Sequence, residues 1–234
     1  MAMLKEQLLL KFSPRSYFSE SIRLIKTNIS FSSIDKDIKT ILITSPLAND
    51  GKSFISTNLA VAYAQSNKKV LLIDGDLREG KLHEVFGLRN SNGYSQLILN
   101  NKKGSKLELD NYIKSTRIEN LSIITRGVTP PNPSELLNSE NNINLLNSLK
   151  KHFDVIIVDS TPVLGLSDSI ITSKLTDYNI LVVSCNKSRS SDIEEALNQF
   201  TKSSSKVDGI VLNKIAQRKI NDKYYNSKYY YEGK

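Results

Sequence analysis

The sequence predicts a single doubly wound α/β domain, in which helices flank a central, mostly parallel β-sheet. Three observations support this fold class: short apolar runs recur along the chain, helical patterns lie between most of them, and the runs are almost continuously apolar rather than alternating. Continuous runs are typical of strands that are buried on both faces of a parallel sheet. Folds of this class bind ligands beyond the carboxyl ends of their strands. We therefore expect the functional residues directly after the apolar runs.

The predicted elements alternate along the chain. Strands are predicted at residues 39–44, 68–74, 120–125, 153–159, 178–184 and 206–213. Helices are predicted at residues 52–65, 134–150, 168–176 and 190–203. A further helix is expected at 17–31, because Phe18, Ile22, Ile25 and Ile29 form one apolar stripe at helical spacing. This stripe predicts that the first helix docks on the domain.

The length and composition fit one sizeable core. The chain has 234 residues, of which 39% are hydrophobic, enough for one α/β domain. We expect an N-terminal segment at 1–37, the domain at 38–216 and a flexible tail at 217–234. No apolar run approaches the roughly 18–20 residues that span a bilayer, so the sequence predicts a cytoplasmic protein. The single cysteine, Cys185, excludes an intrachain disulfide and is expected to be a buried small hydrophobe.

The net charge of +8 does not by itself indicate a nucleic-acid partner. The basic residues are spread along the chain, with no run of five or more. We therefore predict no nucleic-acid partner.

The segment TSPLANDGKS, residues 44–53, has the layout of a phosphate-binding loop between a buried strand and a helix. Gly51 would allow close approach to an anion, and the N–H groups from Asn49 to Phe54, including that of Asp50, would face the phosphates. Lys52 would bridge the β- and γ-phosphates, and the hydroxyl of Ser53 would hold Mg²⁺. Pro46 stands where the general pattern has its first glycine.

Acidic residues at the ends of two other predicted strands complete a nucleotide site. Asp74 and Asp76 follow one strand, with Arg78 beyond them, and Asp159 ends another. A carboxylate at the end of a strand beside the phosphate loop commonly holds Mg²⁺, usually through water. Together with the loop, these positions predict binding of a nucleotide with Mg²⁺.

Two further features lie outside this site. Glu20, Arg23 and Lys26 recur every three residues on another face of the first helix, where they could be local charge pairs on a solvated surface. The tail has almost no aliphatic residues and cannot fold alone, yet it holds half of the ten tyrosines. The tail tyrosines are Tyr224, Tyr225, Tyr229, Tyr230 and Tyr231.

Taken together, these motifs resemble the cytoplasmic domain of the bacterial tyrosine kinases that govern capsule and exopolysaccharide synthesis. Residues 44–53 match the phosphate loop of that family. Its second nucleotide motif, hydrophobic-D-x-D-x-R, is matched by residues 73–78, and its third, hydrophobic-D-[ST]-x-P, by residues 158–162. PPNPSELL at 130–137 matches a further family block and is the most specific string in the chain.

The resemblance implies an ATP-dependent, P-loop protein tyrosine kinase. Lys52, Asp74 and Asp76 would be catalytic, with Asp74 accepting the proton of the incoming tyrosine. Ser53, Asp76 and Asp159 would hold Mg²⁺. Arg78 would join the nucleotide-binding residues, and Asn213, at the end of the last strand, is a candidate contact for the adenine.

The resemblance also implies partners. Glu20, Arg23 and Lys26 match an N-terminal family motif and imply contacts between subunits of a ring, such as an octamer, in the unphosphorylated state. The tail tyrosines would be autophosphorylation sites, and a tail of about 15–20 residues spans roughly 20–25 Å, enough to reach a neighbouring subunit. A membrane-spanning activator on a separate chain would hold the protein at the inner face of the membrane, and a cognate tyrosine phosphatase would reverse the modification.

Several positions depart from the family pattern. Ala48-Asn49 replaces a common Pro-Gly pair in the loop, although asparagine tolerates left-handed geometry. Glu79-Gly80 stands where a basic residue and proline are frequent, and Thr161 replaces a proline. Lys26 replaces an arginine, which weakens bidentate contact with a carboxylate.

These departures leave two alternatives to the kinase. One is a catalytically weak, ATP-binding scaffold that regulates a polysaccharide machine by assembly. The other is a positioning ATPase of the ParA and MinD type, which shares the fold and the aspartates. Such ATPases carry an additional lysine early in the loop, where this chain has Leu47, and have no need of the tyrosine tail. An iron-sulfur relative is excluded because one cysteine cannot supply the ligands.

Overall fold

A computed structural model describes residues 8, 10, 13, 16–32, 37–101 and 109–215. Within them the strands form one seven-stranded sheet in the order β3-β4-β2-β5-β1-β6-β7. Only β3 is antiparallel to its neighbour; the other pairs are parallel. The strands are β1 (Thr40–Thr44), β2 (Val70–Asp74), β3 (Lys114–Ser115), β4 (Leu121–Ile124), β5 (Val155–Asp159), β6 (Tyr178–Ser184) and β7 (Gly209–Asn213).

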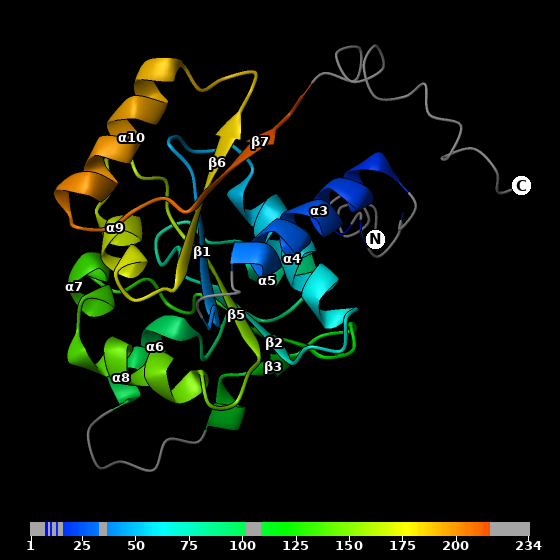
Figure 1. Cartoon of the computed structure of the whole chain (residues 1–234). Helices are drawn as coiled ribbons and strands as arrows, with labels where there is room; N and C mark the ends of the chain where they lie inside the picture. The colour runs from blue at the N-terminus through cyan, green and yellow to red at the C-terminus, as the bar shows by residue number, and fades with distance from the viewer. Residues whose placement is uncertain are drawn as a thin grey trace, which may run out of the picture.

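Helices cover both faces of this sheet (Figure 1). Helices α3 (Tyr17–Ser32), α4 (Lys52–Ala64) and α5 (Leu82–Phe86) pack on one face. The other face carries α6 (Tyr94–Asn100), α7 (Pro133–Leu137), α8 (Glu140–Leu149), α9 (Asp168–Ser173) and α10 (Ser190–Lys202). A short 3₁₀ helix, η1 (Leu109–Asn111), precedes β3.

Alternating side chains explain why the strands have no polar face. In β1, Ile41 and Ile43 join the core beneath α3 and α4, whereas Leu42 joins the core beneath α6 to α8. All five residues of β1, β2 and β5 are buried. This burial and the parallel pairing confirm the doubly wound, mostly parallel α/β fold, and the pairing places the carboxyl ends of β1, β2 and β5 at one edge.

The expected helix at 17–31 is confirmed as α3. Ile22 and Ile29 are buried, and Phe18 and Ile25 pack partly buried against the same core. The ring of Phe18 lies 4.6 Å from that of Phe54 on α4, centroid to centroid. The apolar stripe therefore docks α3 on the domain as predicted.

Three expectations about local structure were wrong or incomplete. The single helix predicted at 134–150 is two helices, because Ser139 caps α8 by accepting the Asn142 N–H (3.3 Å) and so ends α7 before it. Cys185 is exposed rather than buried, since β6 ends one residue earlier, at Ser184. The short elements α5, α6 and β3 were not predicted.

Among the described residues, no helix combines the length and apolar character needed to cross a membrane.

Candidate active site

The loop between β1 and α4 turns through two left-handed residues. Asn49 has φ 64° and Gly51 has φ 107°. The sequence expectation that Asn49 could adopt this geometry is therefore met. A Cβ on Gly51 would lie 2.0 Å from Nδ2 of Asn213, so neither the backbone angle nor the space admits a side chain there.

The loop is held by a residue at the end of β7 and by one that follows β6. Asn213 donates from Nδ2 to the carbonyl of Asp50 (2.9 Å), and Ser188 donates its hydroxyl to the Asp50 carboxylate (3.1 Å). The same carboxylate accepts the N–H of Leu47 (3.0 Å). The carboxylate of Asp50 therefore stabilises the conformation of the loop. The sequence had predicted a contact of this residue with the nucleotide.

Two surface lysines also stabilise the loop by binding its carbonyl groups. Lys187 donates to the carbonyl of Ala48 (2.7 Å), and Lys214 donates to the carbonyl of Asn49 (2.6 Å). A carbonyl directed at a phosphate would repel it, so a phosphate loop works only when its carbonyls have other partners. The two lysine contacts favour a loop conformation in which N–H groups remain available for phosphate.

The amino end of α4 supplies those N–H groups. Gly51 precedes the helix and provides no side-chain cap. At the start of the helix, the N–H of Ile55 donates to the carbonyl of Gly51. The first N–H groups of a helix have no intrahelical partner and attract anions. The ring of Phe54 packs against Phe18, so this residue has only its N–H to offer a phosphate.

Lys52 and two carboxylates converge at this edge of the sheet. Asp74 and Asp159 are register partners at the ends of β2 and β5. Lys52 and Asp159 interact electrostatically, and Ser53 and Ser56 offer hydrogen bonds to Asp159. The side chains of Lys52, Asp74 and Asp159 are all buried.

Burial dominates the acidity of the two aspartates. Desolvation raises the pKa of Asp159 to about 6, against the lowering effects of Lys52 and of the Ser53 hydroxyl. Desolvation, followed by repulsion from Asp159, raises the pKa of Asp74 well above its usual value, although the Leu82 N–H bonds to its carboxylate. Each carboxylate keeps one buried oxygen, Oδ1, without a partner among the described residues.

Asp76 lies in the loop after β2. Its Oδ1 accepts the N–H groups of Arg78 (3.2 Å) and Glu79 (2.9 Å). The Arg78 side chain turns to α9, where it pairs with Asp168 (2.8 Å). The predicted nucleotide contact of Arg78 therefore competes with its ion pair to the buried Asp168.

These donors fit a nucleotide with Mg²⁺. A serine hydroxyl and carboxylates are oxygen ligands of the kind that Mg²⁺ prefers, and two of the carboxylate oxygens are buried without a partner in the described part of the chain. The N–H groups of the loop and of α4 fit phosphates. No group of three or more His, Cys, Asp or Glu side chains in the described ranges forms a metal cage of its own.

The structure brings together most of the residues that the sequence singled out. Residues 49–54, Asp74, Asp76, Asp159 and Asn213 gather at the carboxyl edge of the sheet. Glu20, Arg23 and Lys26 lie apart from it, on α3. The five tail tyrosines lie outside the described residues.

Sequence reasoning missed several residues that support the site. Three of them contact Arg78: Ser134 and Asp168 bind its side chain, and Arg126 binds its carbonyl. The others, Ser188, Lys187 and Lys214, bind the phosphate loop. Of these residues, only Ser134 lies in a sequence motif, PPNPSELL. The others are single polar residues without a local pattern.

The fold and this site define a nucleotide-binding domain with a phosphate loop. In agreement, the family described as "AAA domain" matches residues 38–213. The protein CapB of Staphylococcus aureus is 41% identical over 218 residues, which cover 93% of this chain and 91% of CapB. Tyrosine-protein kinase YwqD of Bacillus subtilis is 36% identical, with 86% of this chain and 82% of YwqD covered. The chain belongs to the family of bacterial tyrosine-protein kinases that contains YwqD.

Solved structures agree with this assignment. The chimerical protein CapA2B2 superposes with a TM-score of 0.84 at 36% identity, covering 91% of each chain. The kinase domain of the Escherichia coli tyrosine kinase ETK gives a TM-score of 0.79 at 31% identity, covering 85% of this chain and 76% of that one. The septum site-determining protein MinD of Pyrococcus horikoshii gives 0.61 at 23% identity, over 79% and 76% of the two chains, and so shares the fold alone.

The relatives differ in how much of their own length the match covers. The match covers 91% of CapB but only 26% of the tyrosine-protein kinase ptk of Acinetobacter johnsonii. The comparisons favour the kinase over the positioning ATPase, because the kinase relatives are more similar in both sequence and structure.

Proposed function

We propose that this protein transfers the γ-phosphate of ATP to tyrosine side chains of its own C-terminal tail and thereby regulates the synthesis and export of a capsular or extracellular polysaccharide. The observation that carries the proposal is the pair of buried aspartates, Asp74 and Asp159, held in register beside Lys52. Membership of the tyrosine-protein kinase family supports the reaction type.

In the proposed reaction, the phenol oxygen of a tyrosine forms a bond to the γ-phosphorus while the bond from that phosphorus to the bridging oxygen of ADP breaks. Asp74 takes the phenol proton, and ADP leaves. A raised pKa makes a carboxylate a stronger base, which favours this role for Asp74. Lys52 and the N–H groups of the loop would hold the phosphates.

Mg²⁺ would neutralise the developing charge on the phosphates, with Ser53, Asp76 and Asp159 as its protein ligands. Asn213 remains a predicted nucleotide contact.

We further propose an organisation around this domain. Residues 1–37 would carry the oligomerisation helix, 38–216 the kinase domain and 217–234 the tail that is phosphorylated. Unphosphorylated subunits would form a ring through Glu20, Arg23 and Lys26. A membrane-spanning activator on a separate chain would dock near the nucleotide and hold the ring at the inner face of the membrane. A tyrosine phosphatase would reset the tail.

Phosphorylation would act on the ring through charge. Each phosphate adds about −1.5 to −2 charges to a tail that carries several lysines. Successive transfers would reverse the sign of the tail and loosen a packed ring.

The test is the mass of the intact protein after incubation with ATP and Mg²⁺. The wild type, Lys52→Ala and a truncation after residue 220 are compared, each alone and with a candidate activator fragment. Mass steps of one phosphate in the wild type, absent from both variants, are expected. Slow ATP hydrolysis without added mass, with and without activator, would instead favour the scaffold or the positioning ATPase.

A further inference from the structure

Arg78 is engaged through its N–H, its carbonyl and two of its three guanidinium nitrogens. Its N–H donates to Oδ1 of Asp76 (3.2 Å), and its carbonyl accepts from the guanidinium of Arg126 (3.1 Å). Its own guanidinium donates to both oxygens of Asp168, from Nε (2.8 Å) and from Nη2 (3.3 Å). The residue thus connects the loop after β2 with two other parts of the chain.

Asp168 is the buried centre of this cluster. It is the first residue of α9 and is fully buried. Ser134 donates its hydroxyl to Oδ1 of Asp168 (2.5 Å) and lies 3.2 Å from Nη2 of Arg78. A buried carboxylate needs such partners, because an ion without them is strongly disfavoured in the interior. Asp168 therefore fixes the direction of the Arg78 side chain.

Ser134 brings the most specific string of the sequence into this arrangement. It is the second residue of α7, within PPNPSELL. Helices α7 and α9 pack against each other. The cluster therefore joins three segments, namely the loop after β2, the amino end of α7 and the amino end of α9.

The cluster also reaches the predicted metal ligand. Oδ1 of Asp76 accepts two consecutive N–H groups, those of Arg78 and Glu79. The orientation of the Asp76 carboxylate thus depends on the backbone at residue 78. That backbone is fixed on one side by Arg126 and, through the side chain of Arg78, on the other side by Asp168.

We propose that Arg78 is a positioning residue and not a nucleotide ligand: the Arg78–Asp168–Ser134 cluster holds the loop after β2 so that Asp76 is oriented to bind Mg²⁺. This inference revises the predicted role of Arg78. It rests on the proposed function only in taking Asp76 as a Mg²⁺ ligand. A residue that orients a ligand without touching the ion typically changes metal affinity by about 10–100-fold when it is lost.

The test separates Mg²⁺ binding from nucleotide binding. A fluorescent ADP analogue is titrated into the full chain without Mg²⁺, and Mg²⁺ is then titrated into the complex. The variants are Arg78→Lys, which keeps the charge but loses the fork, Ser134→Ala and Asp168→Asn. Asp177→Asn is the matched control, because Asp177 is also an ion-paired aspartate but lies at the opposite edge of the sheet.

For the three cluster variants, the Mg²⁺ concentration at half-saturation is expected to rise about tenfold. Their affinity for the ADP analogue without Mg²⁺ should stay within about twofold of wild type, and the control should change neither quantity. Ser134→Ala keeps the ion pair and so remains informative if a charge variant does not fold.

Two outcomes would overturn the proposal. One is weaker binding of ADP without Mg²⁺ in Arg78→Lys alone, which would make Arg78 a nucleotide ligand. The other is wild-type Mg²⁺ dependence in all folded cluster variants. Neither readout requires transfer to tyrosine, so a failure of the kinase proposal in the mass experiment is distinguishable from a failure here.

Discussion

Asp74 and Asp159 are register partners at the carboxyl ends of the adjacent strands β2 and β5, and both side chains are buried. Two carboxylates in this arrangement disfavour each other's ionisation, and burial disfavours ionisation of each one separately. A bound Mg²⁺ would supply the positive charge that this arrangement lacks in the free protein. An active site that is unfavourable without its ligand is therefore expected to limit the stability of the free protein.

The first prediction concerns the pH dependence of that stability. The folded-state pKa of Asp159 is raised to about 6, above its unfolded value of 3.8. The contribution of a group with a raised pKa is present at low pH and is lost as the pH rises through the folded pKa. With EDTA present and no nucleotide, we expect the melting temperature to fall as the pH rises from about 5 to about 7.5.

Asp159→Asn should remove much of this slope and, at a pH of about 7.5, raise the free energy of unfolding by about 2 kcal/mol. Circular dichroism melts at several pH values measure both effects. A variant less stable than wild type at the upper end of this pH range would show that Asp159 is compensated in the free protein.

The second prediction concerns Gly51. Its φ of 107° opposes a side chain, and a Cβ at this position would come within 2.0 Å of Nδ2 of Asn213. Gly51→Ala should therefore weaken binding of an ADP analogue at least about fivefold, because such backbone strain costs about 1–3 kcal/mol. Isothermal titration with Mg-ADP measures the change, and Gly87→Ala is a control at a left-handed glycine with nothing within 4 Å.

A double variant divides the effect of Gly51→Ala into its two causes. Adding Asn213→Ala removes the steric conflict but not the left-handed backbone. Measured against Asn213→Ala alone, Gly51→Ala is therefore expected to weaken Mg-ADP binding less than it does in the wild type. Unchanged affinity in the single variant would contradict the loop conformation described above.

The sequence was sufficient to predict the sheet because short, nearly continuous apolar runs between polar turns are typical of strands buried on both faces. It was not sufficient for short or capped elements. The pattern of residues 134–150 stays amphipathic across Ser139, and only the hydroxyl cap at that position separates α7 from α8. Cys185 shows the same limit, since an apolar run does not indicate at which residue pairing ends.

For the site, the sequence indicated the residues that lie in a family motif or at the end of a predicted strand. Lys52, Asp74 and Asp159 were found in this way. Asp168 was missed because its partner Arg78 is 90 residues away, and no local pattern links an arginine in one loop to the first residue of a distant helix. Long-range polar pairs of this kind need the tertiary structure.

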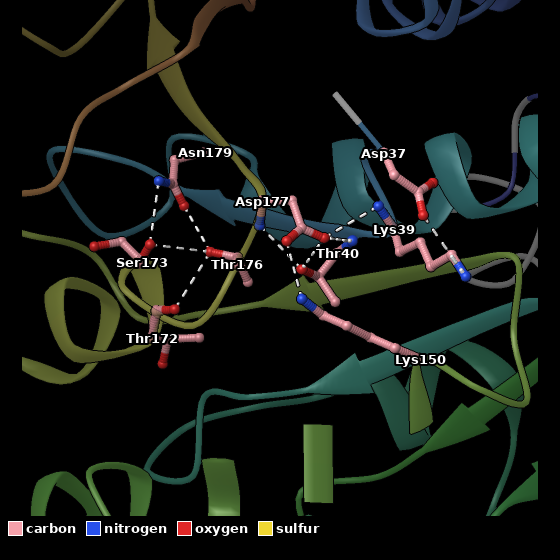
Figure 2. Close-up of polar contacts among 9 residues, drawn as sticks. All are labelled: Asp37, Lys39, Thr40, Lys150, Thr172, Ser173, Thr176, Asp177 and Asn179. Atoms are coloured by element: carbon pink, nitrogen blue, oxygen red, sulfur yellow. Dashed lines mark hydrogen bonds and ion pairs between the residues drawn. The ribbon is translucent and has the colours of Figure 1, made fainter. Parts of the chain in front are cut away.

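The third prediction concerns Asp177, which directly precedes β6 at the edge opposite the active site. Figure 2 shows its polar contacts. Its carboxylate accepts from Lys150 (2.9 Å) and from both the N–H (2.8 Å) and the hydroxyl (2.7 Å) of Thr40. These bonds connect the start of β1 with the end of α8. Burial alone would raise the pKa of Asp177, but the hydrogen bonds from Lys150 and Thr40 together outweigh it and lower the pKa.

A lowered pKa contributes stability above the unfolded value, and this contribution is lost as the pH falls through the folded value. Asp177→Asn should therefore cost about 2 kcal/mol at a pH of about 7 and less at a pH of about 3, which lies below the unfolded value. Urea unfolding at both pH values measures the difference, with the exposed Asp110 as the site of a control Asp110→Asn. An equal cost at both pH values would indicate a loss of packing and not of the charged bonds.

The fourth prediction tests the proposed ring. Within the subunit, Glu20 and Arg23 form an ion pair one turn apart on α3, and Lys26 bonds to the hydroxyl of Ser66. Partly exposed pairs of this kind contribute about 0.5 kcal/mol or less to folding. If their role is to contact a neighbouring subunit, removing them should change assembly far more than stability.

Arg23→Ala and Glu20→Ala should each shift the unphosphorylated protein to a smaller species in size-exclusion chromatography with light scattering, while the melting temperature stays close to that of wild type. Asn28→Ala, at an exposed position of the same helix, is the control and should leave the mass unchanged. A wild type that is monomeric before any exposure to ATP would contradict the ring itself. A ring that survives both substitutions would show that another surface forms it, because the charge pair on α3 would then be a solvated feature of the helix.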